Sequence, residues 1–310
     1  MIVATSSGSA VTDIWDKAIS DLLEQFRLDV EVYIHGNGTG QLAALSGADD
    51  NAILTAVIGN QGPEGDHYVE NTALVDVIDI TDYAAVIASA RTVSLRTPTG
   101  LTISGANLAS TGAGDYFVRS GSNTLCPQGY RSIVDTANPV CPAASLYGEI
   151  DRATNSRWKG QVKDIANAFT WALLDAQYDK HVQYCGKKDL KIIADHATIR
   201  AMTATFMPSH VRYVQPDLSK GGKVEVSING LTYKNTVIEE DMNCWRGETY
   251  LLDTATWHLG QVQQIAWLDR DGGMIKWDGG FGWKAVVFWP YELICTAPYR
   301  NIKLQNCLAA

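Results

Sequence analysis

The sequence lacks the residue patterns that mark most metal-binding and covalent-catalytic proteins. Its six cysteines include no C-x-x-C pair, which argues against a zinc site and against a dense disulfide framework. Its six histidines are widely separated, and none has the i, i+4 spacing that places two ligands on one helix face. We therefore expect reduced thiols, no metal and no cofactor.

The sequence also lacks an excess of basic residues, a secretion signal and a long apolar run. The formal net charge of −9 repels phosphates at long range, so a dedicated nucleic-acid reader is not expected and any contact with DNA should be nonspecific. Residues 1–13 lack the basic and apolar regions of a signal peptide, and no apolar run approaches the ~18 residues of a membrane span. These absences predict a protein that is neither secreted through a signal peptide nor embedded in a membrane.

Two short motifs look like chemical sites but are better explained by helix ends. The run Gly36-x-Gly38-x-Gly40 follows a helical pattern instead of a strand and lacks the Lys-Ser/Thr of a phosphate-binding loop. Asp195-His196 would suit an acid/base pair, but no serine elbow or cysteine nucleophile signature accompanies it, and Asp195 is a good helix N-cap. We find no catalytic constellation and predict that the protein is not an enzyme.

What the sequence does contain is a long amphipathic helix over residues 11–34. Apolar residues recur there at steps of three and four, and Trp15 and Phe26 lie on the apolar side. About two dozen helical residues extend ~36 Å, which is long for a globular protein. We expect the helix to end at Gly36, where glycine permits a left-handed cap.

The rest of the chain, with 46% apolar residues over all 310 positions, should fold around a sizeable core. Runs at 53–58, 74–80 and 92–96 predict a β-rich module within residues 51–125. We predict a second helix over 156–181, capped by Asn155 or Ser156, then a strand at 190–194 and a helix over 195–206. Asn229-Gly230 predicts a tight hairpin turn between strands at 223–228 and 231–238, because both turn positions need positive φ. Later strands are predicted at 249–252, 264–268, 274–277 and 283–296.

Taken in order, these segments resemble the major capsid proteins of tailed bacteriophages with the Hong Kong 97-type fold. The helix that runs into residues 33–40 is similar to the family's spine helix with its glycine-rich exit, and residues 114–121 resemble the end of a β module that one branch inserts after it. The most specific stretch is 147–160, in which Ile-Asp-Arg, with Asp151 and Arg152, precedes an Asn-x-x-Trp-x-Gly turn that contains Trp158. The resemblance covers nearly the whole chain and lies in the order and spacing of the motifs.

The resemblance implies an α+β fold with three parts. Residues 1–40 and 286–310 would form a peripheral domain, residues 41–148 an inserted β-rich module, and residues 149–285 an axial domain that meets its copies at the capsomer centre. Family members also carry an N-terminal arm and an extended loop before the spine helix, so the cross-linking residues of that loop are not carried over to this sequence. The residues expected to serve structure or subunit contacts are Trp15, Phe26, Gly36, Asp151, Arg152, Trp158, Asn229 and Gly230.

The function that the resemblance implies is that of a structural protein of the virion. Hexamers and pentamers of one chain would build an icosahedral shell around double-stranded DNA, after assembly in the host cytoplasm. The expected partners are further copies of the chain, a portal, scaffolding or decoration proteins, and packaged DNA contacted nonspecifically.

Two alternatives stay open. An encapsulin-like compartment would use the same fold to store protein cargo, and imaging of the shell contents separates it from a phage head. The nine tryptophans would also suit a prophage-encoded glycan-binding or hydrolytic β protein. A pocket with convergent carboxylates would favour that second alternative.

Overall fold

The structure is a computed structural model that describes residues 8–45, 53–54, 56–57, 73–81, 85–97, 100–105, 108, 111–112, 114–136, 146–152, 154–165, 169–185, 190–206, 231–234, 236–267, 275–276, 283–284 and 287–308. Helices and sheets both contribute, so the fold is α+β. The helices are α1 (Gly8–His35), α2 (Tyr130–Ile133), α3 (Trp171–Cys185) and α4 (His196–Phe206), and the 3₁₀ turns are η1 (Ser156–Trp158), η3 (Thr254–Thr256) and η4 (Pro298–Arg300). None of the helices in these ranges is both long and apolar enough to cross a membrane.

A seven-stranded antiparallel sheet follows α1 in the chain. Its strand order is β2-β6-β5-β4-β7-β1-β3. The buried side chains Val75, Val77, Val93 and Phe117 lie in its core. The strands are β1 (Ala43–Leu45), β2 (Ile53–Leu54), β3 (Ala56–Val57), β4 (Leu74–Ile78), β5 (Val86–Thr97), β6 (Gly100–Ile103) and β7 (Tyr116–Arg119).

A six-stranded mixed sheet forms the second core. Its strand order is β10-β21-β14-β11-β13-β12, so strand β21 near the end of the chain lies between β10 and β14. The proposed division into peripheral, inserted and axial domains stays a prediction. The strands are β10 (Gln161–Asp164), β11 (Leu190–Ala194), β12 (Leu231–Tyr233), β13 (Thr236–Glu240), β14 (Thr249–Asp253) and β21 (Ile302–Gln305).

The strands of this sheet bury both faces. Ile192 and Leu251 are paired across β11 and β14 and pack with Leu174 of α3 and Met202 of α4. The alternate residues Ile193 and Tyr250 point to the opposite face, as successive residues of a strand must, and pack with Val134 and Trp257. The end of α1 joins the sheet on this second face, because the ring of His35 contacts Tyr250.

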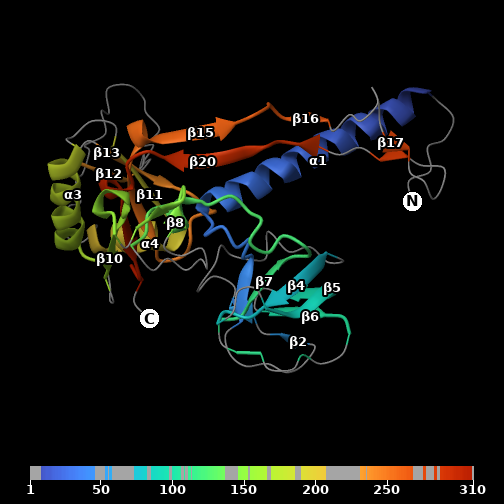
Figure 1. The fold of residues 1–310 in the computed structure, drawn as a ribbon, viewed down its shortest axis with the longest axis horizontal. Coiled ribbons are helices and arrows are strands. Elements are labelled where there is room, and N and C mark those ends of the chain that lie inside the picture. The colour runs from blue at the N-terminus through green and yellow to red at the C-terminus, as the bar shows by residue number, and fades with distance from the viewer. Residues whose placement is uncertain are drawn as a thin grey trace, which may run out of the picture.

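A long two-stranded ribbon runs beside α1 (Figure 1). Its successive antiparallel pairs are β15 (Trp257–Gln261) with β20 (Tyr291–Cys295), β16 (Ala266–Trp267) with β19 (Val287–Phe288), and β17 (Ile275–Lys276) with β18 (Trp283–Lys284). The Phe26 ring of α1 lies 6.3 Å from the Trp289 ring of the ribbon. We call α1 and the ribbon together the arm. It extends from the six-stranded sheet, and the seven-stranded sheet lies below it near the end of α1 (Figure 1).

Several predicted elements are confirmed, with one correction at the end of the long helix. Helix α1 contains the predicted span 11–34, and strands β4, β11 and β14 and helix α4 occur where they were expected. The expected left-handed cap at Gly36 is wrong, since the positive φ angles occur two and four residues later, at Gly38 (88°) and Gly40 (78°). The tight turn is displaced into the loop because loop 122–128 packs against it, with the Gln128 side chain next to Gly38.

The predicted helix over 156–181 is also wrong in its first half. Residues Ser156–Trp158 form a single 3₁₀ turn, Gln161–Asp164 form β10, and the helix begins only at Trp171. The reason is tertiary: β10 pairs in parallel with β21, with Gln161 opposite Ile302, and Gly160 N donates a hydrogen bond to Asp135 O over 2.8 Å. Pairing with a strand more than a hundred residues away overrides the local helical spacing.

The second arm of the predicted hairpin needs a correction too. Residues 231–238 do not form one strand, because β12 and β13 pair with each other, with Tyr233 opposite Thr236. Lys234 occupies the intervening turn with a positive φ of 46°. The predicted turn at Asn229 and Gly230 lies outside the described residues.

Candidate functional site

The described residues contain no group that would serve as a metal site, and the suspected acid/base pair is a helix cap. Among them, no cluster of three or more His, Cys, Asp or Glu side chains is suited to hold a metal ion. Asp195 Oδ2 accepts hydrogen bonds from the backbone N–H groups of Ala197 (2.9 Å) and Thr198 (3.3 Å), which satisfies the first turn of α4. Burial raises the pKa of the Asp195 carboxyl above its usual value, and these hydrogen bonds offset only part of that rise. His196 is exposed and pairs with Glu240.

The end of α1 meets the six-stranded sheet in a buried junction. His35 Nε2 lies 2.9 Å from Asp241 Oδ2, and the His35 ring contacts Tyr130 edge-on with centroids 5.2 Å apart. Burial by itself raises the pKa of the Asp241 carboxyl, but the hydrogen bond and charge of His35 outweigh burial and lower it. Burial, with the charges of Asp241 and Glu239, raises the pKa of Tyr130 to about 12. The contact therefore joins helix and sheet through a polar pair shielded by aromatic rings.

Two buried ion pairs continue this junction. Lys303 of β21, only 1% exposed, donates to Asp135 Oδ2 over 2.6 Å. Arg131 of α2 donates to Glu248 Oε1 over 3.0 Å, and its guanidinium lies 3.4 Å from the centre of the Trp245 ring. Because breaking a buried pair leaves an uncompensated charge, these contacts hold α2 firmly to the sheet. Helix α2, the segment that follows it and strand β21 of the sheet are thereby fixed together.

The most specific stretch of the resemblance forms a compact cluster around Tyr147. Trp158 Nε1 donates to Tyr147 O over 2.6 Å, and the Arg152 guanidinium lies 5.3 Å from the centre of the Tyr147 ring. Arg152 is fully buried and donates to Ser132 O over 2.5 Å. Asp151 belongs to β9 (Ile150–Asp151), which pairs with β8 (Leu146–Tyr147), and its backbone O accepts from Asn155 N over 3.1 Å. The structure thus brings these three predicted residues into one cluster, in which Arg152 is buried and Asp151 and Trp158 are half-buried.

The other predicted site residues lie along α1 or outside the described part of the chain. Phe26 is half-buried against Trp289, and Gly36 follows the last residue of α1. Trp15 lies within α1, but its side chain is not among those described. The roles of all eight residues in subunit contacts stay predictions.

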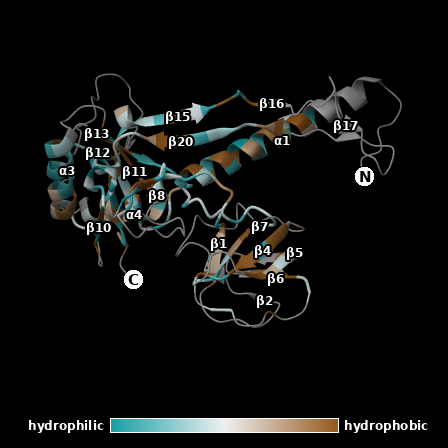
Figure 2. Ribbon diagram, viewed as in Figure 1, coloured by the Kyte–Doolittle hydropathy of each residue, from teal (hydrophilic) through white to brown (hydrophobic). Residues whose placement is uncertain are grey.

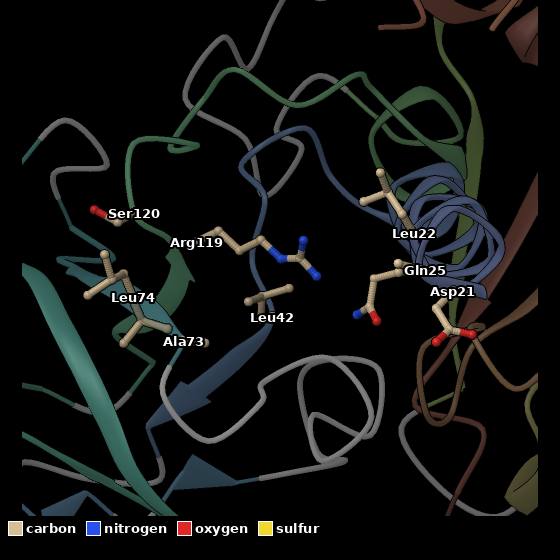
Figure 3. Close-up of a pocket in the computed structure, with 10 residues that line it drawn as sticks. Asp21, Leu22, Gln25, Leu42, Ala73, Leu74, Arg119 and Ser120 are labelled. Carbon is tan, nitrogen blue, oxygen red and sulfur yellow. The ribbon is translucent and has the colours of Figure 1, made fainter. Parts of the chain in front are cut away.

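An open cleft of about 830 Å³ lies between α1 and the seven-stranded sheet, at the start of β4 and the end of β7. Leu22 and Gln25 line it on the helix side and Leu74 on the sheet side, and the Arg119 side chain points across it toward α1 (Figure 3). The Arg119 guanidinium binds both carboxylate oxygens of Asp29 over 2.5 and 2.6 Å. This two-point contact fixes the sheet to α1 with the geometry that arginine and carboxylate favour.

The arm exposes many large apolar side chains. Hydrophobic and hydrophilic residues alternate along the coloured part of α1 (Figure 2), and three of its leucines are 39–43% exposed. Val262 of the ribbon is 92% exposed. A two-stranded ribbon is at best marginally stable alone, and clustered exposed apolar side chains mark interaction surfaces. The exposed side chains are Leu22, Leu23 and Leu28 of α1 and Leu259, Val262, Ile265, Phe288 and Ile294 of the ribbon.

Sequence reasoning missed the charged members of the junction. Asp135 and Lys303 lie 168 positions apart, and neither stands in a pattern that distinguishes a buried ion from a solvated one. The ribbon was predicted in part, because strands were expected at 264–268, 274–277 and 283–296, where β16, β17 and β18–β20 occur. Its pairing and its exposed apolar side chains were not predicted.

Comparison with solved structures finds a weak likeness, and comparison with sequence families finds none. No protein-family model and no curated protein matches the sequence. Among solved structures, the chain is similar to the capsid asymmetric unit of cyanophage A-1(L), with 14% sequence identity and a TM-score of 0.38. The similarity covers 57% of this chain and 59% of that chain, so the match spans less than two thirds of the other protein.

Proposed function

We propose that this chain is the major capsid protein of a tailed bacteriophage or prophage. In this role, copies of one chain assemble into hexamers and pentamers of an icosahedral shell with the Hong Kong 97-type architecture, which encloses double-stranded DNA. The observation that carries the proposal is the arm, because its apolar side chains remain exposed although both sheets bury cores of their own. The resemblance of residues 33–40 and 147–160 to the capsid family supports it.

The occupant of the arm's surface in this proposal is a second copy of the same chain. Eight large apolar side chains of the arm are exposed by 39–92%. Complete burial of such a side chain contributes about 1.5–3 kcal/mol, so covering roughly half of each would contribute on the order of 6–12 kcal/mol before the costs of association. Association costs are of similar size, about 4–15 kcal/mol. A single contact would therefore be weak, and a closed shell would be stable because each subunit makes several contacts.

The proposal assigns no reaction to the chain. A portal, scaffolding or decoration proteins, and nonspecifically contacted DNA are its expected partners, and the virion capsid is its expected location. His196→Ala offers a test, since His196 carries the only acid/base motif that the sequence suggested. We expect particles of normal yield from this variant.

Negative-stain microscopy and light scattering of the purified chain test the shell. We expect closed particles from the natural sequence and soluble, folded monomers or small oligomers from Val262→Asp. The matched control is Leu95→Asp, because Leu95 is an apolar side chain of the seven-stranded sheet that is 53% exposed. This control should still form particles.

Three outcomes would contradict the proposal. The chain could remain monomeric at every concentration, Val262→Asp could assemble normally, or the control could fail as completely as Val262→Asp. Shells isolated from the natural source that hold protein cargo and no DNA would favour the compartment alternative instead.

A further inference from the structure

A second cleft, of about 560 Å³, is lined by cations and aromatic rings. It is formed where η1 and α3 both approach η4. Among the described residues that line it there is no aspartate or glutamate, although the whole chain carries a net charge of −9. The lining residues are Ser156, Arg157, Lys159, Gly160, Gln161, Lys180, Tyr184 and Tyr299.

The three cations of this cleft are free to bind an external anion. Arg157 and Lys180 are exposed and Lys159 is half-buried, and none forms an ion pair within the described part of the chain. By contrast, Arg300 beside the cleft is paired with Asp253 over 3.3 Å, and Lys303 is paired in the junction. Within the described part of the chain, three cations without a carboxylate partner therefore line one cleft.

Helix α3 separates its charges in a way that keeps the cleft cationic. Asp175 and Asp179 lie one turn apart and both bind Lys234, over 2.9 and 3.3 Å. Lys180 and Tyr184 lie one turn apart on a different side of the helix and line the cleft. The carboxylates of α3 therefore lie at Lys234 and do not line the cleft.

Aromatic rings stand beside the cations. Tyr184 is 48% exposed, and its ring meets Tyr299 edge-on with centroids 6.2 Å apart. The backbone of Tyr299 is itself fixed, because Gln161 Nε2 donates a hydrogen bond to Tyr299 O over 2.6 Å. Gln161 Oε1 is buried, and no group of the described chain donates a hydrogen bond to it. An exposed ring over a rigid support is a suitable platform for a planar base.

We propose that this cleft binds a nucleic-acid strand that has at least one unpaired base. Arg157, Lys159 and Lys180 bind its phosphates, and an unpaired base stacks on Tyr184. Cations with interleaved aromatic rings are the combination by which proteins bind single strands without sequence preference. Carboxylates on an acidic polypeptide would satisfy the cations but would leave the Tyr184 face unused. The inference rests on the cleft and is independent of shell formation.

The test is fluorescence anisotropy of a labelled 20-nucleotide deoxythymidine strand with the purified, unassembled full chain. Neutralising three phosphates predicts that affinity falls about 18-fold between 50 and 200 mM salt, since the logarithmic slope is about −0.7 per phosphate for a single strand. Arg157→Gln/Lys180→Gln leaves one cation, so its affinity should fall only about threefold over the same range. Lys17→Gln/Arg200→Gln removes the same two residue types from exposed positions elsewhere and should behave as the natural chain does.

Tyr184 tests the stacking separately from the charge. Tyr184→Ala should weaken binding at least about fivefold with no change in the salt slope, because base stacking on an aromatic ring contributes that much or more. Tyr184→Phe keeps the ring and should bind as the natural chain does.

The inference would be overturned if the natural chain did not bind the strand, or if the control double variant lost as much affinity as Arg157→Gln/Lys180→Gln. A polyglutamate of matched charge that competed as well as the strand would show an acidic polypeptide to be the ligand and would also overturn it. Microscopy of the same preparation, at concentrations at which the natural chain is expected to assemble, separates this result from the proposed function. Particles without strand binding refute only the inference, and strand binding without particles refutes only the capsid role.

Discussion

The buried pair between Lys303 and Asp135 gives the sharpest test of how strand β21, near the end of the chain, is held to the segment that follows α2. Lys303→Met keeps the aliphatic stem and removes the charge, which leaves the Asp135 carboxylate buried without the cation 2.6 Å away. Breaking a buried pair from one side costs about 3–5 kcal/mol, because the remaining ion has lost both its partner and its water. The total stability of a domain is only about 5–15 kcal/mol. We therefore expect a large shift of the unfolding midpoint to lower urea.

Removing both charges should cost less than removing the lysine alone. In Asp135→Asn/Lys303→Met the side chain at 135 is neutral, and its carbonyl oxygen can still accept from Thr136 N, as Asp135 Oδ1 does now over 2.6 Å. We expect the double variant to recover about 1–3 kcal/mol relative to Lys303→Met, which is the usual coupling of contacting residues. The unpaired charge of Asp135 is therefore expected to cause most of the stability lost in Lys303→Met.

The assay is urea unfolding followed by tryptophan fluorescence and by far-ultraviolet circular dichroism. Lys163→Met is the matched control, because Lys163 is exposed on the adjacent strand opposite Leu304 and its loss should change stability by less than about 0.5 kcal/mol. A cost below about 1 kcal/mol for Lys303→Met would refute the reasoning. So would a double variant no more stable than the single one.

Three further predictions concern the arm and the junction. Phe26→Asp should remove about 1–2 kcal/mol of packing between α1 and the ribbon, as expected for a half-buried ring, and should lower particle yield far more than monomer yield, measured by microscopy and by soluble expression. Gly129→Val should destabilise the fold by more than about 2 kcal/mol in urea, because its Cβ would overlap backbone oxygens in the last turn of α1, whereas Gly148→Asn at an open turn with a φ of 57° should be neutral. The lowered pKa of Asp241 means that its contribution to stability is complete above the pKa of an unfolded aspartate and is lost as the pH falls through the lower, folded value. Asp241→Asn should therefore flatten the acid side of the stability profile, and an unchanged profile would show that the His35 contact contributes nothing.

The sequence by itself determined the elements whose signals are local. The three- and four-residue spacing of apolar residues was sufficient for α1, because an amphipathic helix is specified by its own period. Asp195 marked the start of α4 because a helix N-cap involves only the next three residues. The apolar runs of β4, β11 and β14 likewise predicted buried strands. In the arm, the apolar side of α1, including Phe26, and the positions of several ribbon strands could be predicted.

Tertiary structure alone decided the features that depend on residues far apart in the chain. Gln161–Asp164 became a strand because β21 was available to pair with it, and no local pattern contains that partner. Lys303 and Arg152 are buried because their partners come from other segments, whereas a charged residue in a sequence is expected at the surface. The cationic cleft arises in the same way, from η1, α3 and η4, which are separated in the chain and meet only after folding. Local period and capping are properties of a few neighbouring residues, but burial and pairing are properties of the whole fold.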